Sequence, residues 1–176
     1  KMIIAATLLG ILMHAFAKEC ELMPPASNFD SKKYFNIPHV YVTHSKNGPD
    51  KKVCREYKTT KNSNGTTNTE VTVKTGGKEQ TLLKCINKEK NGKAGQYSVE
   101  CEVPNGNHKI QLETSVFATD NKNYALLQSC NKNGKNDFDI FVLQTNKDGL
   151  DPGVTAVFDL TKWPLDKWVS RSNVNC

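Results

Sequence analysis

Short turn signals recur along this chain at nearly constant intervals, and their spacing constrains the fold more than any other feature. Asn-Gly and Gly-Gly pairs supply the positive φ that tight hairpin turns require. The turn signals are Asn47-Gly48-Pro49, Asn64-Gly65, Gly76-Gly77, Asn91-Gly92, Asn105-Gly106, Asp120-Asn121-Lys122-Asn123 and Asn133-Gly134. The runs between them are rich in Val, Thr, Tyr, Ile and Leu and predict strands over 39–46, 51–61, 67–75, 79–88, 96–103, 108–118, 123–131 and 138–146.

Short connections between all eight strands predict an antiparallel meander. Eight strands of about ten residues can close into an up-and-down barrel whose interior holds one small ligand. A Greek-key sandwich is the alternative, but it needs a long crossing connection and none is visible. We therefore expect an all-β, eight-stranded up-and-down antiparallel barrel.

The residues after the last strand predict a loop and then a helix. Asp148 to Gly153 read as a loop. Leu165, Trp168 and Val169 recur at i, i+3 and i+4 behind Pro164, which suits a first helical turn. We expect a short amphipathic C-terminal helix there, packed on the barrel wall.

The first segment indicates secretion. Lys1 precedes an apolar run that ends in Ala15-Phe16-Ala17, the pattern of a secretory signal peptide with its cleavage site. The run is shorter than the ~20 residues that a membrane-spanning helix needs. We expect a signal peptide over 1–17 and a secreted domain over 18–176, with no membrane attachment.

Six cysteines without any C-x-x-C pair predict three disulfides rather than a zinc cluster. Cys85 and Cys101 lie at equal distances from Lys93, so they face each other in the hairpin that turns there. Local spacing leaves three possible pairings among the other four cysteines. These are Cys20, Cys54, Cys130 and Cys176.

The motifs of common enzymes are missing from the sequence. It contains no Gly-x-Ser-x-Gly, H-E-x-x-H or P-loop pattern, so we expect no catalytic activity. His39 and His44 are five residues apart on one strand and point to opposite faces, which disfavours a metal site.

The net charge of +6 comes mostly from lysines spread over turns and strand faces, which indicates a solubilising surface rather than a nucleic-acid site. Asn64-Gly65-Thr66 is a sequon for N-glycosylation on an exposed turn.

Arg55 is the candidate ligand-binding cation. Strand alternation puts Arg55 and Tyr57 on one face and Cys54 and Glu56 on the other. If Cys54 faces outward, Arg55 and Tyr57 face the cavity. A buried guanidinium needs an anionic or hydrogen-bonding partner and binds a carboxylate through two hydrogen bonds. An internal salt bridge, or a position at the barrel mouth, is the alternative.

Several stretches together resemble the triabin-type salivary lipocalins of blood-feeding triatomine bugs. The resemblance runs from the signal peptide to the terminal Cys176. Where lipocalins usually carry Gly-x-Trp in the first strand, this chain has Pro38-His39-Val40. The expected fold therefore rests on the meander and on the triabin-type stretches. These are Lys33-Tyr34-Phe35-Asn36, Val40-Tyr41-Val42-Thr43-His44 and Tyr124-Ala125-Leu126-Leu127-Gln128-Ser129-Cys130.

The resemblance implies disulfide pairings and a set of cavity residues. It implies Cys20–Cys130 and Cys54–Cys176, beside Cys85–Cys101. It places Cys54 outward and Arg55 inward, and it implies that Val42, Leu127 and Ser129 line the interior, with His44 nearer the mouth. Haem carriers of this group hold the haem by one axial histidine, and no histidine lies between His44 and His108. No haem or other cofactor is therefore expected.

The resemblance also implies an antihaemostatic function in saliva. We expect a secreted monomer that inhibits platelet aggregation by stoichiometric capture of an acidic lipid, thromboxane A2 or another prostanoid. Arg55 would meet the carboxylate, and Tyr57 and Ser129 would offer hydrogen bonds. An inward cation has the wrong charge for biogenic amines. The alternative is a surface inhibitor of a host haemostatic protein: a platelet receptor, the collagen response or a clotting protease.

Overall fold

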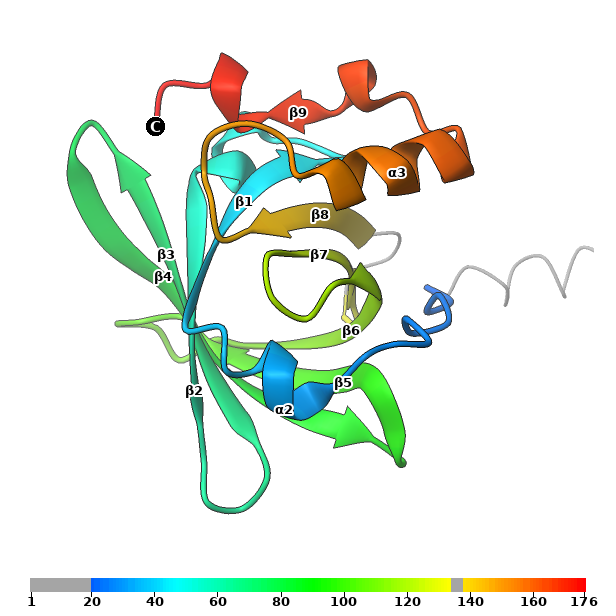
Figure 1. Ribbon diagram of the computed structural model, residues 1–176. Coiled ribbons are helices and arrows are strands. Elements are labelled where there is room, and N and C mark those ends of the chain that lie inside the picture. Colours follow the sequence, from blue (N-terminus) through cyan, green and yellow to red (C-terminus); the bar gives the residue numbers. More distant parts are fainter. Residues whose placement is uncertain (1–19, 134–137) are drawn as a thin grey trace, which may run out of the picture.

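The computed structural model describes residues 20–133 and 138–176, and it forms a closed antiparallel barrel (Figure 1). Its sheet order is β2-β3-β4-β5-β6-β7-β8-β1-β9, and β1 also pairs with β2, which closes the barrel. The predicted signal peptide lies outside the described residues. The strands are β1 (His39–Ser45), β2 (Arg55–Lys61), β3 (Thr67–Thr75), β4 (Lys78–Lys90), β5 (Lys93–Glu102), β6 (Lys109–Thr119), β7 (Tyr124–Asn131), β8 (Phe138–Gln144) and β9 (Val169–Ser170).

The barrel confirms the predicted meander, and most strand boundaries lie within a few residues of those expected. The second strand differs because Asp50–Cys54 form a 3-10 turn after Pro49, so β2 begins only at Arg55. The turn residues have the expected left-handed backbone at Asn91, with φ of 41°, and at Gly92, with φ of 70°. These positive φ values suit the tight reversal between β4 and β5.

The C-terminal helix is present, but earlier in the chain than predicted. Helix α3 covers Pro152–Thr161, whereas Leu165–Lys167 form only a 3-10 turn. The Asp151 carboxylate caps α3 by accepting a hydrogen bond from the Gly153 amide at 2.8 Å, and Pro152 occupies the first turn. Asp-Pro-Gly also suits a turn, which is why the sequence suggested a loop there.

Helix α3 and the tail pack on the outside of the barrel wall (Figure 1). Val154 and Phe158, one turn apart, contact Ile140 and Val142 of β8 in an apolar cluster that includes Trp168. Alternate residues of β8 therefore face this outer cluster, while Asp139, Phe141 and Leu143 line the barrel interior. Both faces of β8 are buried, so its apolar residues do not alternate with polar ones.

A short helix and three disulfides complete the fold. Helix α2 (Ser31–Tyr34) begins behind Asp30, whose carboxylate accepts from the Lys32 and Lys33 amides, and it lies near the β2–β3 turn. The structure pairs Cys20 with Cys130, Cys54 with Cys176, and Cys85 with Cys101. These are the pairs that the hairpin register and the family resemblance gave.

Arg171 fastens the C-terminal tail to the start of β2. Its guanidinium donates to the Val53 carbonyl oxygen at 2.9 Å, lies 3.9 Å from a Glu56 carboxylate oxygen, and stacks 5.2 Å from the centre of the Tyr41 ring. Only 12% of its side-chain surface is exposed. One side chain thus joins the tail to β1, β2 and the 3-10 turn before β2.

We expect Arg171→Met to lower the free energy of unfolding by about 1–3 kcal/mol, because it leaves the Val53 carbonyl oxygen without its donor and removes the cation that pairs with Glu56. Chemical denaturation with the disulfides intact measures this change. Lys167→Met, at an exposed position of the same tail, is the matched control and should stay within about 0.5 kcal/mol of the parent. Equal stability of the two variants would contradict a fastening role for Arg171.

Candidate functional site

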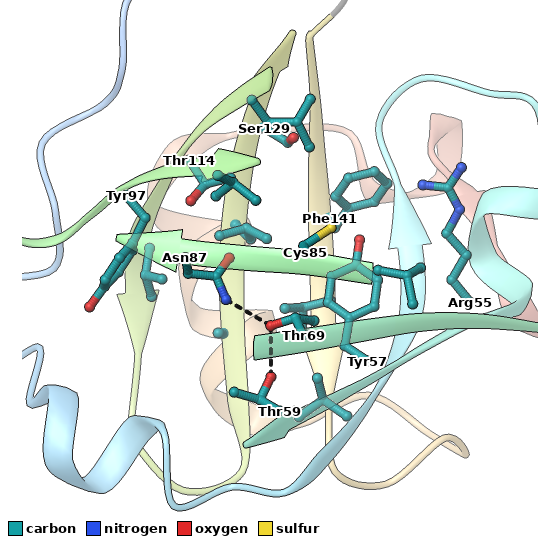
Figure 2. Close-up of a pocket in the computed structure, with 18 of the residues that line it drawn as sticks. Arg55, Tyr57, Thr59, Thr69, Cys85, Asn87, Tyr97, Thr114, Ser129 and Phe141 are labelled. Atoms are coloured by element: carbon teal, nitrogen blue, oxygen red, sulfur yellow. Dashed lines mark hydrogen bonds between the residues drawn. The ribbon is translucent and has the colours of Figure 1, made fainter. Parts of the chain in front are cut away.

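The barrel encloses a cavity of about 280 Å³, and most of its wall surface is apolar (Figure 2). This volume lies close to the lower end of the ~300–1,000 Å³ typical of small-molecule sites. Its walls come from nearly every strand of the barrel. Apolar lining residues include Val40, Val71, Leu83, Val99, Ile110, Leu112, Val116, Leu127, Phe141 and Leu143.

Charged side chains gather where β2 begins. Lys52, Arg55 and Asp139 are the charged residues of the cavity lining, which gives it a net charge of +1. Lys52 Nζ lies 2.9 Å from Asp139 Oδ2, and the two side chains are 16% and 4% exposed. This buried pair neutralises itself, and the surplus positive charge belongs to Arg55.

Asp139 has further donors that hold it in place. Its carboxylate accepts hydrogen bonds from the Ser45 hydroxyl at 2.6 Å, the backbone amide of Asn47 at 2.9 Å and the backbone amide of Ile140 at 2.8 Å. These bonds tie the segment after β1 to β8 and leave Asp139 little capacity for a ligand cation. A buried carboxylate with so many donors is an organising group rather than a vacant anionic site.

Arg55 lies at the edge of the cavity without an anionic partner. No carboxylate in residues 20–133 and 138–176 comes within ion-pair distance of its guanidinium. Its neighbour Glu56 faces outward, where it contacts His39 at 3.1 Å and Arg171. Figure 2 shows Arg55 at the right edge of the view, on the opposite side from Tyr97.

Tyr57 and Ser129 also line the cavity, together with Leu127. Burial raises the pKa of the Tyr57 phenol, while the nearby Arg55 guanidinium opposes this rise. The phenol therefore stays protonated at physiological pH and remains a hydrogen-bond donor. Arg55 and Tyr57 thus present a cation and a hydroxyl to the same end of a cavity whose walls are mostly apolar.

Val42 lies inside the barrel as expected, but other side chains cover it and it does not reach the cavity surface, whereas His44, expected nearer the mouth, does not line the cavity. Val42 is fully buried in the apolar packing with Val53 and Phe141. A β-bulge between Val42 and His44 interrupts the alternation of β1, so Ser45 reaches Asp139 inside the barrel. The His44 ring instead contacts the Thr43 hydroxyl at 3.1 Å, and its strand position pairs with Ser170 of β9.

Sequence reasoning missed part of the lining. It gave no role to Lys52 and Asp139, or to the polar residues Thr59, Thr69, Asn87, Tyr97 and Thr114, all of which line the cavity. Their spacing within β2 to β6 follows the strand alternation, which could have placed them on the inner face. The pairing of Lys52 with Asp139 joins residues far apart in the sequence and left no local signal.

Comparison with known proteins identifies the family. Residues 17–157 match the sequence profile of the family described as Triabin. The chain belongs to the triabin family. It is 67% identical to pallidipin of Meccus pallidipennis over all of this chain and 97% of that protein. It is 47% identical to platelet inhibitor triplatin-2 of Triatoma infestans, over all of this chain and 99% of that protein.

Solved structures agree with the lipocalin barrel. The tryptamine complex of the amine-binding protein of Rhodnius prolixus superposes with a TM-score of 0.71 at 14% identity, covering 88% of this chain and 87% of that one. The leukotriene C4 complex of LTBP1 gives a TM-score of 0.58 at 22% identity, covering 79% of this chain and 84% of that one. At these identities the likeness shows the fold alone.

The triabin-family chain is therefore a triatomine salivary lipocalin, secreted into saliva. Proteins of this family are ligand-binding barrels rather than enzymes. No helix within the described residues is long and apolar enough to cross a membrane.

His44 gives the stability of the fold a testable pH dependence. Burial lowers the pKa of His44 below its ordinary value of 6.5, so the unfolded chain binds the proton more readily than the folded one. The stability that His44 confers is complete above pH 6.5 and falls as the pH drops through its folded pKa. We expect the free energy of unfolding to decrease between pH 7.5 and 5.5, and His44→Gln to flatten this decrease.

Denaturation midpoints across that pH range measure the effect. His108→Gln, at an exposed loop position, serves as the control and should leave the slope as it is. A slope that is the same with and without His44 would contradict a lowered pKa at this half-buried position.

Proposed function

We propose that this protein inhibits platelet aggregation by capturing an acidic lipid mediator, thromboxane A2 or a related prostanoid, in the barrel cavity. Arg55 carries the proposal, because it is a cation at the edge of an apolar cavity for which the described residues supply no counter-ion. A lipid carboxylate would fill that role through two charge-assisted hydrogen bonds. Tyr57 and Ser129 would hydrogen-bond the ligand, and Leu127 would contact its hydrocarbon chain.

The apolar walls favour a long hydrocarbon chain. Burial of each methylene group contributes about 0.8 kcal/mol, so a chain of ~20 carbons gains several kcal/mol even when only part of it is covered. The charge contact then selects acids among apolar ligands and fixes their orientation. Capture needs no turnover, which agrees with a family of binding proteins, and it acts when the protein outnumbers the mediator.

Two relatives support this proposal from different directions. Triplatin-2 is named a platelet inhibitor, and the LTBP1 structure holds leukotriene C4, an acidic eicosanoid, in a barrel of this fold. The amine-binding neighbour holds tryptamine, a cation. The unbalanced positive charge of the present cavity favours the acid over the amine.

Calorimetric titration with a stable thromboxane A2 mimetic tests the role of Arg55. We expect one-to-one binding, and we expect Arg55→Gln to weaken it about 10- to 100-fold, the cost of losing a charge-assisted hydrogen bond. Lys58→Gln is the matched control, since it removes one cation from the outer face of the same strand. It should bind as the parent does.

Platelet assays separate capture from surface inhibition. Under the proposal, Arg55→Gln loses inhibition in parallel with binding, and Lys58→Gln keeps both. Inhibition that persists in a folded Arg55→Gln protein that no longer binds the mimetic would overturn capture and leave a protein target on the outer surface.

A further inference from the structure

The turn between β2 and β3 carries Asn64-Gly65-Thr66, the only glycosylation sequon of the sequence. Asn64 is exposed on this turn. Gly65 has a φ of 83°, and a side-chain atom added there would meet, beyond its chain neighbours, none of the described residues within 4 Å. The turn therefore extends into open solvent, where a bulky sugar meets no steric obstacle.

Thr66 orients the side-chain amide of Asn64. The Thr66 hydroxyl donates a hydrogen bond to Asn64 Oδ1 at 2.6 Å, and the Thr66 backbone amide donates to the same oxygen at 3.1 Å. Two donors on this oxygen stabilise negative charge there, which favours loss of a proton from the amide nitrogen. Among the described residues no acceptor binds Asn64 Nδ2, the nitrogen that carries an N-linked sugar. This nitrogen is therefore free to react.

The hydrogen bonds of the turn depend on local sequence alone. The Asn62 side-chain amide donates to the Thr66 hydroxyl at 2.9 Å, and the Asn62 backbone amide donates to the Thr66 carbonyl oxygen at 2.9 Å. Bonds between such near neighbours form turns without support from distant residues. The segment can thus adopt this shape in a chain that is still being secreted, which is when N-linked sugars are added.

Two other Asn-Gly turns show that hairpin formation alone does not require this arrangement. Asn91 and Asn105 have φ of 41° and 65° and are followed by glycine, but the next residue is Lys93 or Asn107. Neither of these residues has the hydroxyl that Thr66 supplies. The pairing of an exposed asparagine with a hydroxyl two residues later is therefore specific to the β2–β3 turn.

The β2–β3 turn lies at the end of the barrel opposite Arg55. Arg55 begins β2, and the strand Arg55–Lys61 spans about 20 Å before the turn. Lys61 Nζ donates to Asn36 Oδ1 at 2.6 Å, just after α2, so the turn is held beside that helix. Figure 1 shows the turn at the bottom of the view and the C-terminal tail at the top.

We propose that Asn64 carries an N-linked glycan, which covers the α2 end of the barrel and leaves the Arg55 end open. The sugar then screens the outer hollow of about 180 Å³ between α2 and the β2–β3 turn. It hinders contact of other proteins with that end. This inference does not depend on the ligand of the cavity.

The donor of the sugar is a lipid-linked oligosaccharide diphosphate of the secretory pathway. Asn64 Nδ2 forms a bond to the anomeric carbon of the oligosaccharide, and the bond from that carbon to the diphosphate oxygen breaks. The nitrogen gives up one proton, and the lipid diphosphate leaves with the electron pair.

Peptide mass spectrometry of the full chain secreted from cultured insect cells tests the site. We expect one oligosaccharide on the peptide that contains Asn64, and we expect a peptide-N-glycosidase to remove it and leave Asp at that position. Thr66→Ala should abolish the sugar, whereas the matched variant Thr66→Ser, which keeps a hydroxyl, should retain it. A secreted parent with unmodified Asn64, or with Asn64 converted to Asp without any sugar, would overturn the proposal.

Titration with the stable thromboxane A2 mimetic tests the position of the glycan. The glycosylated protein and the same protein after enzymatic removal of the sugar should bind with affinities within about twofold of each other, because the sugar is attached far from Arg55. Clearly weaker binding by the glycosylated form would overturn its placement away from the Arg55 end. Failure of both forms to bind would overturn the proposed function and leave the glycan at Asn64 standing.

Discussion

Closure of the barrel depends on β1, which pairs with β8 on one side and with β2 on the other. This double pairing gives hydrogen-bond partners to the backbone edges of β2 and β8, so the sheet has no open edge there. The closed sheet surrounds an interior that holds side chains and a cavity. The start of β2 is held at the same place from outside, by the Cys54–Cys176 disulfide and by Arg171. The backbone at Arg55 is therefore held by the neighbouring strand β3 and, through the residues just before it, by the C-terminal tail.

The chemistry of the interior follows from how its charges are paired. The Asp139 carboxylate forms an ion pair with Lys52 and accepts hydrogen bonds from three further donors. These bonds hold the segment after β1 in place. In the part of the chain that the structure describes, Arg55 has no such partner. An uncompensated guanidinium beside apolar walls is costly in an empty cavity, and an anionic, largely apolar ligand removes that cost. Under the proposed function, capture of an acidic lipid accounts for a cation at a position where a hydrophobic residue would suit the barrel better.

The sequence predicted the features that depend on local chemistry. Turn residues with positive φ, such as Gly92, marked the hairpins, and alternation placed Arg55 and Tyr57 on the inner face. The prediction for His44 was wrong because a β-bulge shifted the alternation by one residue, and a bulge leaves no clear mark in a strand sequence. The helix was misplaced because Asp151-Pro152-Gly153 suits both a turn and a helix start, and the packing of Val154 and Phe158 on the barrel decides between them.

The most direct test of the account compares one lipid in two charge states. Calorimetric titration would use a stable thromboxane A2 mimetic as the free acid and as its methyl ester, which differ in charge and hardly in apolar surface. If Arg55 selects the ligand by its carboxylate, the acid binds one-to-one and the ester binds about 10- to 100-fold more weakly. Equal affinity for the two forms would contradict the central role of the Arg55 charge.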